Sequence, residues 1–546
     1  MNISSRLSDI ARSNPDKKAI IFSQIKKNPS HFNYSSFSFK ELDILSNKFA
    51  QQLSKLGLQK GDKAFVYLKS SLNTEAMIFA LFKMGAIPVF VDHPMEIKDV
   101  LNSIKESASI ALIAEKKIHL LKFIYPSFFK MIKTNITTGS FAWGKMISIE
   151  KMKKEKIQAF SSTPNNPEEP AAIIFTAESP LDLKGVVYTH SMIEKQVSIF
   201  KELYALTPND TAMTCYPLFS LISTAIGMTN YIPDLALTNN GKYDPKKITQ
   251  NILDLSPTFI SGPPAILEKI ADYCLENEIL LPSVKSVVIF GCPVSSKLQR
   301  KFKTILPNGT SYTTYGALEA LQITRASQDL ILNKTSHLTE EGFGVCLGKP
   351  VPELEIKIIK ITDDTLLFFD TNIELERRQI GEIIVKASSV SKEYFNLPAI
   401  TLQSKIFDTF NTFWHRMGDV GYIDEKGLLW FCGKKSHAVF TKTQTLFPAA
   451  CEAIFNKHPA VKRSALVGIG TQGKQIAAII IERKDGQFLA GKARSIFESE
   501  LLTFSKNYEH TKNIQKIYLS KALPIDSYHS LRIDRLKLKD EIENNH

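Results

Sequence analysis

The sequence lacks any apolar run long enough to cross a bilayer, because its most apolar stretches are interrupted by Lys, Asp or Pro. Its start, MNISSRLSDIARSNPDKKAIIF, lacks the charged-then-apolar layout of a signal peptide. The six cysteines form no CxxC pair and no histidine stands at metal-ligand spacing, which disfavours a zinc site and indicates reduced, mostly buried thiols. These absences predict a soluble, cytoplasmic protein with no membrane span.

Acidic side chains are fewer than basic ones, 55 against 68, and the formal net charge is +13. The excess is mostly Lys, and it is not gathered into the Arg-rich face with interleaved aromatics that is typical of a nucleic-acid binder. The densest run, KMKKEK at 151–156, lies in a polar stretch and favours solvated surface lysines over a binding patch. We therefore expect no nucleic-acid partner.

The chain is rich enough in apolar residues, at 44% of 546 residues, to form a large packed interior, and it is too long for a single core. Helical spacing from Phe39 to Gly57 is followed by a short apolar strand (AFVYLK), a second helix (TEAMIFALFKMG) and another strand (AIPVFVD). This alternation predicts a parallel, doubly wound sheet. Residues 151–170 are polar and Pro-rich and predict a loop that connects two such units.

In the rest of the chain, the pattern of expected strands and helices changes at two points. Strand and helix alternate again from Ala171 past residue 330, and residues 350–400 then contain short β-branched runs (LEIKIIKI, GEIIVKA) that favour a smaller, more antiparallel region. After FCGKKS, one helix (FPAACEAIFNKH) and two strands (SALVGIG, AAIIIERK) indicate a separate unit. We predict an α/β fold, with a large N-terminal region of parallel doubly wound sheets plus a small β-rich part over 1–435, and a small α+β C-terminal domain over 436–546.

The segment AAIIFTAESPLDLKGVVYTH, residues 171–190, is the first with a chemical signature. An apolar strand enters a loop of small residues, and Lys184 and Gly185 precede a second strand. Such loops can surround a phosphate with backbone N–H groups while a Lys neutralises its charge. An ordinary hairpin is the alternative, because no Gly occurs before Gly185.

Three further segments carry polar residues at turns. In SYTTYGALEALQIT, residues 311–324, Glu319 can hold a divalent cation or can be a surface carboxylate. In FWHRMGDVGYIDEKGLLWFCGKKSH, residues 413–437, Asp419 can accept two hydrogen bonds from a ribose diol or can form its own turn. In the same segment, His415 is expected to be structural rather than a general base. In LPIDSYHSLRIDRLKL, residues 523–538, a loop carries the cation Arg532 ahead of a basic helix.

The order and spacing of these segments resemble the adenylate-forming (AMP-binding) superfamily of acyl-CoA synthetases and adenylation domains. TAESPLDLKGVVYTH is similar to the family pattern TSGSTGxPKG, YGALEA to YGxTE, GEIIVKASSVSKEYFNLPAIT to GEIxVxGxxVxxGY, and HRMGDVGYIDEKGLLWFCGKK to TGDxGxxDxxGxxxxxGR. The segments YPLFSL, WHRMGD, LWFCGKKSHAV, RSALVG and LPIDSYHSLRIDR resemble one branch in particular. That branch contains the β-lactone synthetases of olefin biosynthesis and related fatty-acid CoA ligases.

The resemblance implies an enzyme that activates a small carboxylic acid, here a fatty or β-hydroxy fatty acid. A carboxylate attacks the α-phosphate of ATP, with Mg²⁺ as cofactor, and an acyl-adenylate and pyrophosphate form. A mobile C-terminal domain then rotates for a second half-reaction. The acceptor in that step is the thiol of CoA or of a carrier protein, or the substrate's own β-hydroxyl group, which expels AMP.

The resemblance also assigns roles to individual positions. These are Thr176, Ser179, Lys184 and Gly185 in the phosphate loop, Gly291, Tyr315 and Gly316 near the adenine, Glu319 for Mg²⁺, Asp419 for the ribose, Lys434 in place of a family Arg, and Arg532 in place of the catalytic Lys. Lys184, Glu319 and Arg532 receive catalytic roles, because cations and a metal neutralise charge at the phosphoryl centre.

Several positions depart from the family pattern on the phosphate side of the predicted site. Glu178 and Leu181 replace loop glycines that let backbone N–H groups approach phosphate, and Leu318 replaces a Thr. Arg532 keeps a positive charge with a different geometry. Two hypotheses follow: an active ATP-dependent acid ligase, or a catalytically impaired relative that keeps the fold and binds nucleotide.

Overall fold

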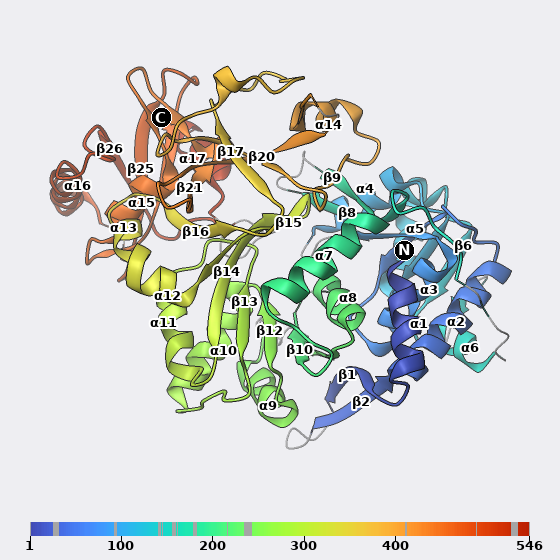
Figure 1. Ribbon diagram of the computed structural model, residues 1–546. Helices are drawn as coiled ribbons and strands as arrows, with labels where there is room; N and C mark the ends of the chain where they lie inside the picture. The colour runs from blue at the N-terminus through green and yellow to red at the C-terminus, as the bar shows by residue number, and fades with distance from the viewer. Residues whose placement is uncertain are drawn as a thin grey trace.

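The computed structural model describes residues 2–25, 32–91, 95–139, 144, 146–155, 160, 162–177, 183–215, 217–233, 243–409, 412–487, 489–525 and 533–544. In Figure 1, the N-terminal third of the chain, its middle and its C-terminal residues occupy three neighbouring parts of the molecule.

The N-terminal third contains a sheet of strand order β7-β6-β5-β3-β4-β8-β9, parallel except for the β8–β9 pair. Its strands are β3 (Lys63–Tyr67), β4 (Ile87–Val91), β5 (Ala111–Ala114), β6 (Thr134–Thr137), β7 (Ile147–Ser148), β8 (Pro170–Ala177) and β9 (Leu183–Thr189). The accompanying helices are α1 (Ile3–Ser13), α2 (Phe39–Lys55), α3 (Leu72–Met84), α4 (Ile97–Ser107), α5 (Lys116–Ile124), the short 3₁₀ helix η1 (Pro126–Phe129) and α6 (Ile149–Lys154). The connector predicted at 151–170 is too long at its start, because helix α6 continues to Lys154. Between α6 and β8, the described residues form no helix or strand.

Local sequence signals set the ends of these helices. Ser38 caps α2 and forms a capping box with Glu41, and the chain leaves the helix at Gly57, where φ is +90°. Helix α3 ends at Gly85 in the left-handed region. The predicted helix from Phe39 to Gly57 and the predicted strand–helix–strand that follows it are therefore confirmed.

A second, mixed sheet has the order β17-β18-β20-β21-β16-β15-β14-β13-β12-β10-β11-β1-β2, and β19 pairs with β20. Its parallel half consists of β1 (Lys18–Ile25), β10 (Thr211–Thr214), β11 (Thr229–Ile232), β12 (Phe259–Gly262), β13 (Ser286–Ile289) and β14 (Thr310–Ala317). The antiparallel strands are β2 (Phe32–Ser38), β15 (Ala320–Ser327), β16 (Val345–Pro350), β17 (Glu355–Ile359), β18 (Gly381–Lys386), β19 (Lys405–Phe407), β20 (Phe413–Ile423) and β21 (Leu429–Lys434). The predicted antiparallel region around residues 350–400 is thus the far edge of this sheet.

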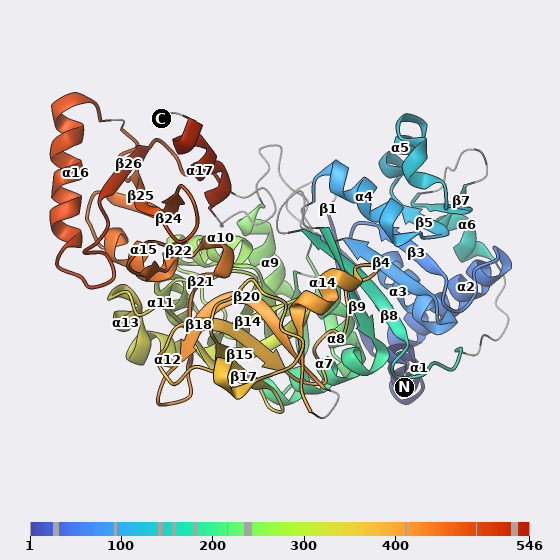
Figure 2. The ribbon, with the colours of Figure 1, turned by 90° about the horizontal axis from the view of Figure 1, so that it is seen from above.

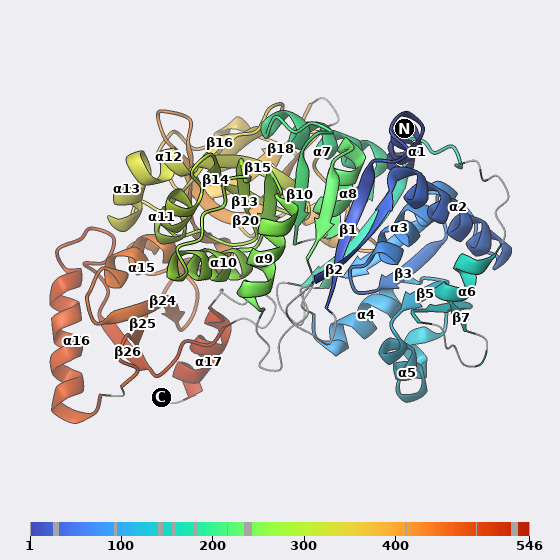
Figure 3. The same ribbon diagram turned by 90° about the horizontal axis from the view of Figure 1, so that it is seen from below.

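Helices separate the two sheets and cover their outer faces. The associated helices are α7 (His190–Leu203), α8 (Pro217–Ile226), α9 (Pro245–Leu255), α10 (Pro264–Glu276), α11 (Ser296–Ile305), α12 (Gln328–Leu330), the π-helix η2 (Ile331–Thr335), α13 (Ser336–Glu340), η3 (Thr371–Ile373), α14 (Pro398–Ser404) and η4 (Lys435–His437). The largest core lies between the sheets and includes side chains of α1, α2, α3, α7 and α8. A second core packs α4 and α5 on the first sheet, and a third packs α9, α10 and α11 on the second sheet (Figure 3).

The C-terminal residues form a sheet and cores of their own. The elements are β22 (Val439–Phe440), β23 (Thr445–Leu446), α15 (Pro448–Asn456), β24 (Val461–Ile469), β25 (Ile476–Arg483), α16 (Gly491–Ser505), β26 (Lys516–Ser520) and α17 (Arg535–Asn544). Strands β24, β25 and β26 form a separate sheet (Figure 2). The two hydrophobic cores that pack on this sheet are built, in the described residues, from residues 439 onward. The α/β class with a C-terminal α+β region is therefore confirmed, whereas the boundary at 435/436 and the mobility of this region stay predictions.

Candidate active site

The predicted phosphate loop connects two antiparallel strands. Thr176 near the end of β8 lies opposite Lys184 near the start of β9. A Cβ on Gly185 would lie 3.1 Å from the Phe175 ring, so the strand pair packs closely at this position. Ser179, the remaining loop residue assigned to phosphate, lies outside the described residues, as do the departures Glu178 and Leu181.

The hairpin of β14 and β15 presents Glu319 in its turn. Gly316 is required just before that turn, because a Cβ there would lie 2.2 Å from the Leu321 carbonyl oxygen. The Tyr188 hydroxyl of β9 donates to the Leu318 carbonyl oxygen at 2.6 Å. This contact joins the hairpin to the strand that carries Lys184.

Tyr394 joins two of the predicted catalytic side chains. Its hydroxyl donates to Glu319 Oε1 at 2.6 Å, and Lys184 Nζ lies 5.7 Å from the centroid of its ring. The Ser391 N–H donates to the Glu319 carbonyl oxygen at 2.7 Å. Residues from three segments far apart in the sequence therefore place a cation and a carboxylate on either side of one tyrosine.

Asp419 of β20 lies beside the other end of the same hairpin. Its Oδ2 accepts a hydrogen bond from the Tyr315 hydroxyl at 2.7 Å, and it lies opposite Lys434 of β21 in the strand register. Gly291, at a φ of +96°, follows Ile289 of β13 by two residues. Ile289 pairs with Thr313, so Gly291 comes at the same level as Tyr315 on the neighbouring strand.

The turn of the β20–β21 hairpin is formed by Asp424 and not by Asp419. Asp424 Oδ1 accepts from the N–H groups of Lys426 and Leu428, each at 2.9 Å, and the Gly427 N–H donates to the Asp424 carbonyl oxygen at 3.0 Å. Asp419, whose carboxylate accepts from the distant Tyr315, is thereby positioned as a side chain of the site.

A buried lysine, Lys405, and a buried histidine, His415, lie next to the segment that carries Tyr394. Lys405 Nζ lies 3.0 Å from His415 Nδ1 and donates to the Ser391 carbonyl oxygen. Burial lowers the pKa of Lys405 to about 7, while the Glu319 charge acts to raise it. Burial, and then the positive charge of Lys405, lowers the pKa of His415 well below its usual value. The imidazole of His415 is thus held neutral, and its structural role stays a prediction.

Sequence reasoning missed Tyr394 and Lys405. A signal for Tyr394 was present, because it is the final Tyr of the matched pattern GEIxVxGxxVxxGY. Lys405 had no such signal, since its role depends on the pairing of β19 with β20.

The structure places the ends of the Arg532 loop but not Arg532 itself, which lies outside the described residues. Ile525 and Ile533, which flank the loop, form an antiparallel bridge. Beyond it, Arg535 Nη2 donates to Glu452 Oε1 at 2.6 Å and fixes the start of α17 to α15. The catalytic role of Arg532 remains a prediction.

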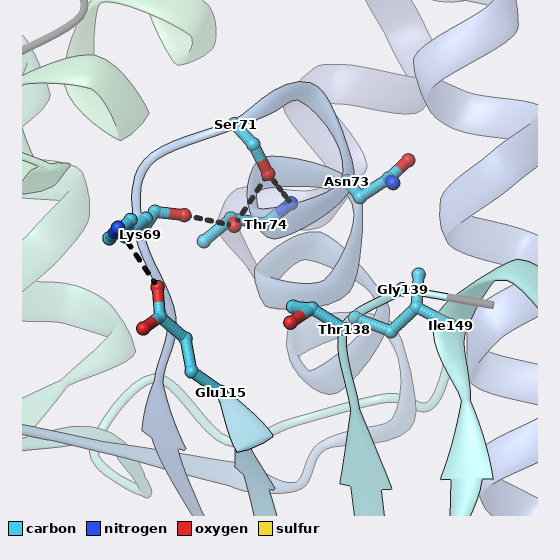
Figure 4. Close-up of a pocket in the computed structure, with 8 residues that line it drawn as sticks. All are labelled: Lys69, Ser71, Asn73, Thr74, Glu115, Thr138, Gly139 and Ile149. Atoms are coloured by element: carbon cyan, nitrogen blue, oxygen red, sulfur yellow. Dashed lines mark hydrogen bonds and ion pairs between the residues drawn. The ribbon is translucent and has the colours of Figure 1, made fainter. Parts of the chain in front are cut away.

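A cavity of about 260 Å³ opens elsewhere, at the carboxyl ends of β3, β5 and β6 (Figure 4). It contains none of the predicted site residues; its lining comprises Lys69, Ser71, Asn73, Thr74, Glu115, Thr138, Gly139 and Ile149. Lys69 and Glu115 face each other there at 3.9 Å, so its charged groups balance.

Comparisons with known proteins agree with the fold. The family described as AMP-binding enzyme matches residues 7–395. The chain is 32% identical to an olefin β-lactone synthetase of Xanthomonas campestris pv. campestris, over 98% of this chain and 96% of the relative. It is 25% identical to a 2-succinylbenzoate–CoA ligase of Geobacillus sp. (strain WCH70), over 93% of each.

A solved structure shares the fold over the whole chain. The O-succinylbenzoate coenzyme A synthetase of Bacillus subtilis in complex with AMP superimposes with a TM-score of 0.75, at 21% identity, over 98% of both chains. The family match, the relatives and the fold place the chain in the class of adenylate-forming acid ligases. The chain belongs to the AMP-binding enzyme family, whose members use ATP.

Among the helices of the described residues, none has the length and apolar character that crossing a bilayer requires.

Proposed function

We propose that this protein activates a carboxylic acid with ATP and releases pyrophosphate. The observation that carries the proposal is the pair of clusters held by one hairpin, Lys184–Tyr394–Glu319 on one side and Tyr315–Asp419 on the other. A cation suited to a triphosphate and a carboxylate suited to its Mg²⁺ ion are thereby linked to a carboxylate suited to a ribose.

The residues at the hairpin fit Mg²⁺ as a cofactor. In the described residues, no group of three or more His, Cys, Asp or Glu side chains is placed to hold a metal ion by itself. Mg²⁺ is typically held by one or two carboxylates together with substrate phosphates and water, and the single carboxylate of Glu319 suits that mode. When bound, the ion would neutralise charge on the phosphates, while the Tyr394 hydroxyl holds Glu319 in position.

In the first half-reaction, a carboxylate oxygen of the acid bonds to the α-phosphorus of ATP and pyrophosphate leaves. Lys184 supplies positive charge near the phosphates, and we propose that Arg532 does so from the C-terminal region. Asp419 accepts hydrogen bonds from the ribose hydroxyl groups, and Tyr315, Gly316, Gly291 and Lys434 line the nucleoside end. Cytoplasmic location is part of this proposal.

We propose closure to a β-lactone as the second half-reaction. The β-hydroxyl oxygen of a β-hydroxy fatty acid bonds to the acyl carbon, AMP leaves with the bonding electrons, and the hydroxyl proton passes to solvent. The support is 32% identity over nearly the full length to an olefin β-lactone synthetase, against 25% to a CoA ligase. Transfer to CoA is the alternative acceptor step, and a carrier-protein thiol is the third.

The test is product analysis by mass spectrometry with ATP, Mg²⁺ and a β-hydroxy fatty acid, with and without CoA. A product lighter than the acid by one water, formed equally without CoA, is expected. An acyl-CoA product that appears only with CoA would replace ring closure by thiol transfer.

A second candidate is a relative that binds nucleotide without adenylating an acid. Glu178 and Leu181 in the phosphate loop favour it, because a carboxylate repels the triphosphate and glycines are lost there. Restoring both glycines together with Arg532→Lys tests it: a gain in acid-dependent turnover would support impairment by these residues, and no gain would contradict it.

A further inference from the structure

Helix α5 stands out from the outer side of the first sheet, beside α4 (Figures 2 and 3), and the 3₁₀ helix η1 follows it in the chain. We call the exposed apolar residues of this segment the α5–η1 tip; their exposed fractions are 49% for Leu120, 75% for Phe123, 65% for Ile124, 42% for Tyr125 and 52% for Met131. Residues 123–127 are all exposed, so Phe123, Ile124 and Tyr125 form an uninterrupted run of exposed apolar residues in the sequence.

The packing of the fold does not explain why these apolar side chains are exposed. The inner face of α5 is already buried through Ile118 and His119, and η1 is anchored by Phe129. Most other large apolar side chains that are exposed in the described residues lie singly along the sequence, such as Leu280 and Ile496. A run of consecutive exposed apolar residues on a projecting helix is typical of an interaction site.

The charge around the tip is positive. From residue 116 to residue 149 the sequence contains six Lys and no Asp or Glu. Lys117, Lys130 and Lys133 are exposed, and Lys122 donates to Asn135 Oδ1 at 2.7 Å beside them. The acidic residue that precedes α5, Glu115, already pairs with Lys117 at 3.6 Å.

The neighbouring helix α4, which packs on η1, adds no net negative charge. Its charged residues are Lys98, Asp99, Lys105 and Glu106, and Asp99 is buried. The tip therefore combines apolar side chains with a basic surround.

We propose that the α5–η1 tip binds the surface of an anionic phospholipid bilayer. Phe123, Ile124 and Tyr125 enter the headgroup region, where an aromatic ring with a hydroxyl group is favoured, and the flanking lysines lie against lipid phosphates. A projecting convex tip suits a flat, deformable surface, whereas a folded protein partner would need a matching hollow. The binding is peripheral, and it does not depend on the proposed chemistry.

The experiment is flotation of the full chain with vesicles of phosphatidylcholine alone or with 30% phosphatidylglycerol. Two double variants test the tip: Phe123→Ser with Ile124→Ser removes apolar area, and Lys130→Glu with Lys133→Glu reverses charge. Leu367→Ser with Phe368→Ser is the matched control, because these are adjacent apolar residues exposed by 47% and 72% elsewhere.

We expect the wild type and the control to bind anionic vesicles and not neutral ones. The charge variant should bind at least about 25-fold more weakly, since each basic side chain near such a surface contributes roughly a fivefold factor. The apolar variant should weaken binding by about tenfold or more. Absence of binding to anionic vesicles, or equal binding by all variants, would overturn the proposal. Self-association that is lost in the apolar variant, measured by sedimentation without vesicles, would instead assign the tip to a second copy of the chain and would also overturn it.

Discussion

Replacing Glu75 with Gln should stabilise the protein at neutral and alkaline pH. Glu75 lies on α3, 1% exposed, in the core between the two sheets. Its Oε1 accepts from Ser220 Oγ at 2.9 Å, Ser220 Oγ in turn accepts from Asn230 Nδ2 at 2.6 Å, and Oε2 has no hydrogen-bond partner among the described residues. The carboxyl group is therefore buried, and none of the ion pairs in the described part of the chain compensates its charge.

The magnitude follows from the pKa of this group. Burial raises the pKa of Glu75 from 4.5 to about 7, and the hydrogen bond from Ser220 opposes the rise. A raised pKa means that the native state holds the proton more tightly than the unfolded chain. The associated stability is present below pH 4.5 and is lost as the pH rises to about 7, a loss of about 3 kcal/mol. Gln keeps the shape and the acceptor for Ser220 but does not ionise.

The assay is unfolding in urea of the wild type and Glu75→Gln at pH 5 and pH 8, followed by intrinsic fluorescence. The free energy of unfolding of Glu75→Gln relative to the wild type should rise by about 2–3 kcal/mol between pH 5 and pH 8. Glu106→Gln, an exposed position on α4, is the control and should show no such change. A difference between wild type and Glu75→Gln that is the same at both pH values would refute the reasoning.

Four further substitutions test other contacts. Arg416→Met leaves the buried Glu382 without its paired hydrogen bonds at 3.1 and 2.6 Å, and should lower the free energy of unfolding by about 3–5 kcal/mol in urea titrations. Lys405→Met should be most stabilising relative to the wild type below about pH 7, where the native state must hold the buried Lys405 as a cation. Above pH 7 the native state gives up this proton, so the advantage should shrink by about 1.4 kcal/mol per pH unit toward pH 9; an advantage that does not shrink would contradict the buried-cation interpretation. Tyr394→Phe should raise the Mg²⁺ concentration for half-maximal turnover about 10- to 100-fold, and an unchanged Mg²⁺ titration would exclude a positioning role. Gly316→Ala should reduce soluble yield and thermal stability, because its Cβ meets the opposing strand, and wild-type melting would show that the hairpin can open.

Elements with local signals could be predicted from the sequence. The ends of α2 and α3 follow from the Ser38 cap and from Gly57 and Gly85, which are readable without any tertiary contact. The alternation of strands and helices likewise predicts parallel sheets on short connections.

Contacts between distant segments could not be predicted from local patterns. Tyr394 reaches Lys184 and Glu319 because residues 393–395 run antiparallel to β9, through the bridge of Val186 with Tyr394. The motif WHRMGD contains Arg416, whose side chain supports the fold through Glu382, a role that is invisible until β18 and β20 are paired.

The structure describes most of the predicted site residues but not all of them. Lys184 and Glu319 both lie beside Tyr394, and Tyr315 contacts Asp419. The roles of all the predicted site residues remain predictions, and Ser179 and Arg532 lie outside the described residues.

The measurement that tests the proposed function most directly is exchange of labelled pyrophosphate into ATP, with Mg²⁺ and a panel of fatty and β-hydroxy fatty acids. We expect acid-dependent exchange by the wild type and by Glu106→Gln, strongest with a β-hydroxy acid, and a loss of about a hundredfold or more in Glu319→Gln. No exchange with any acid, or exchange that Glu319→Gln leaves unchanged, would contradict adenylation at this site.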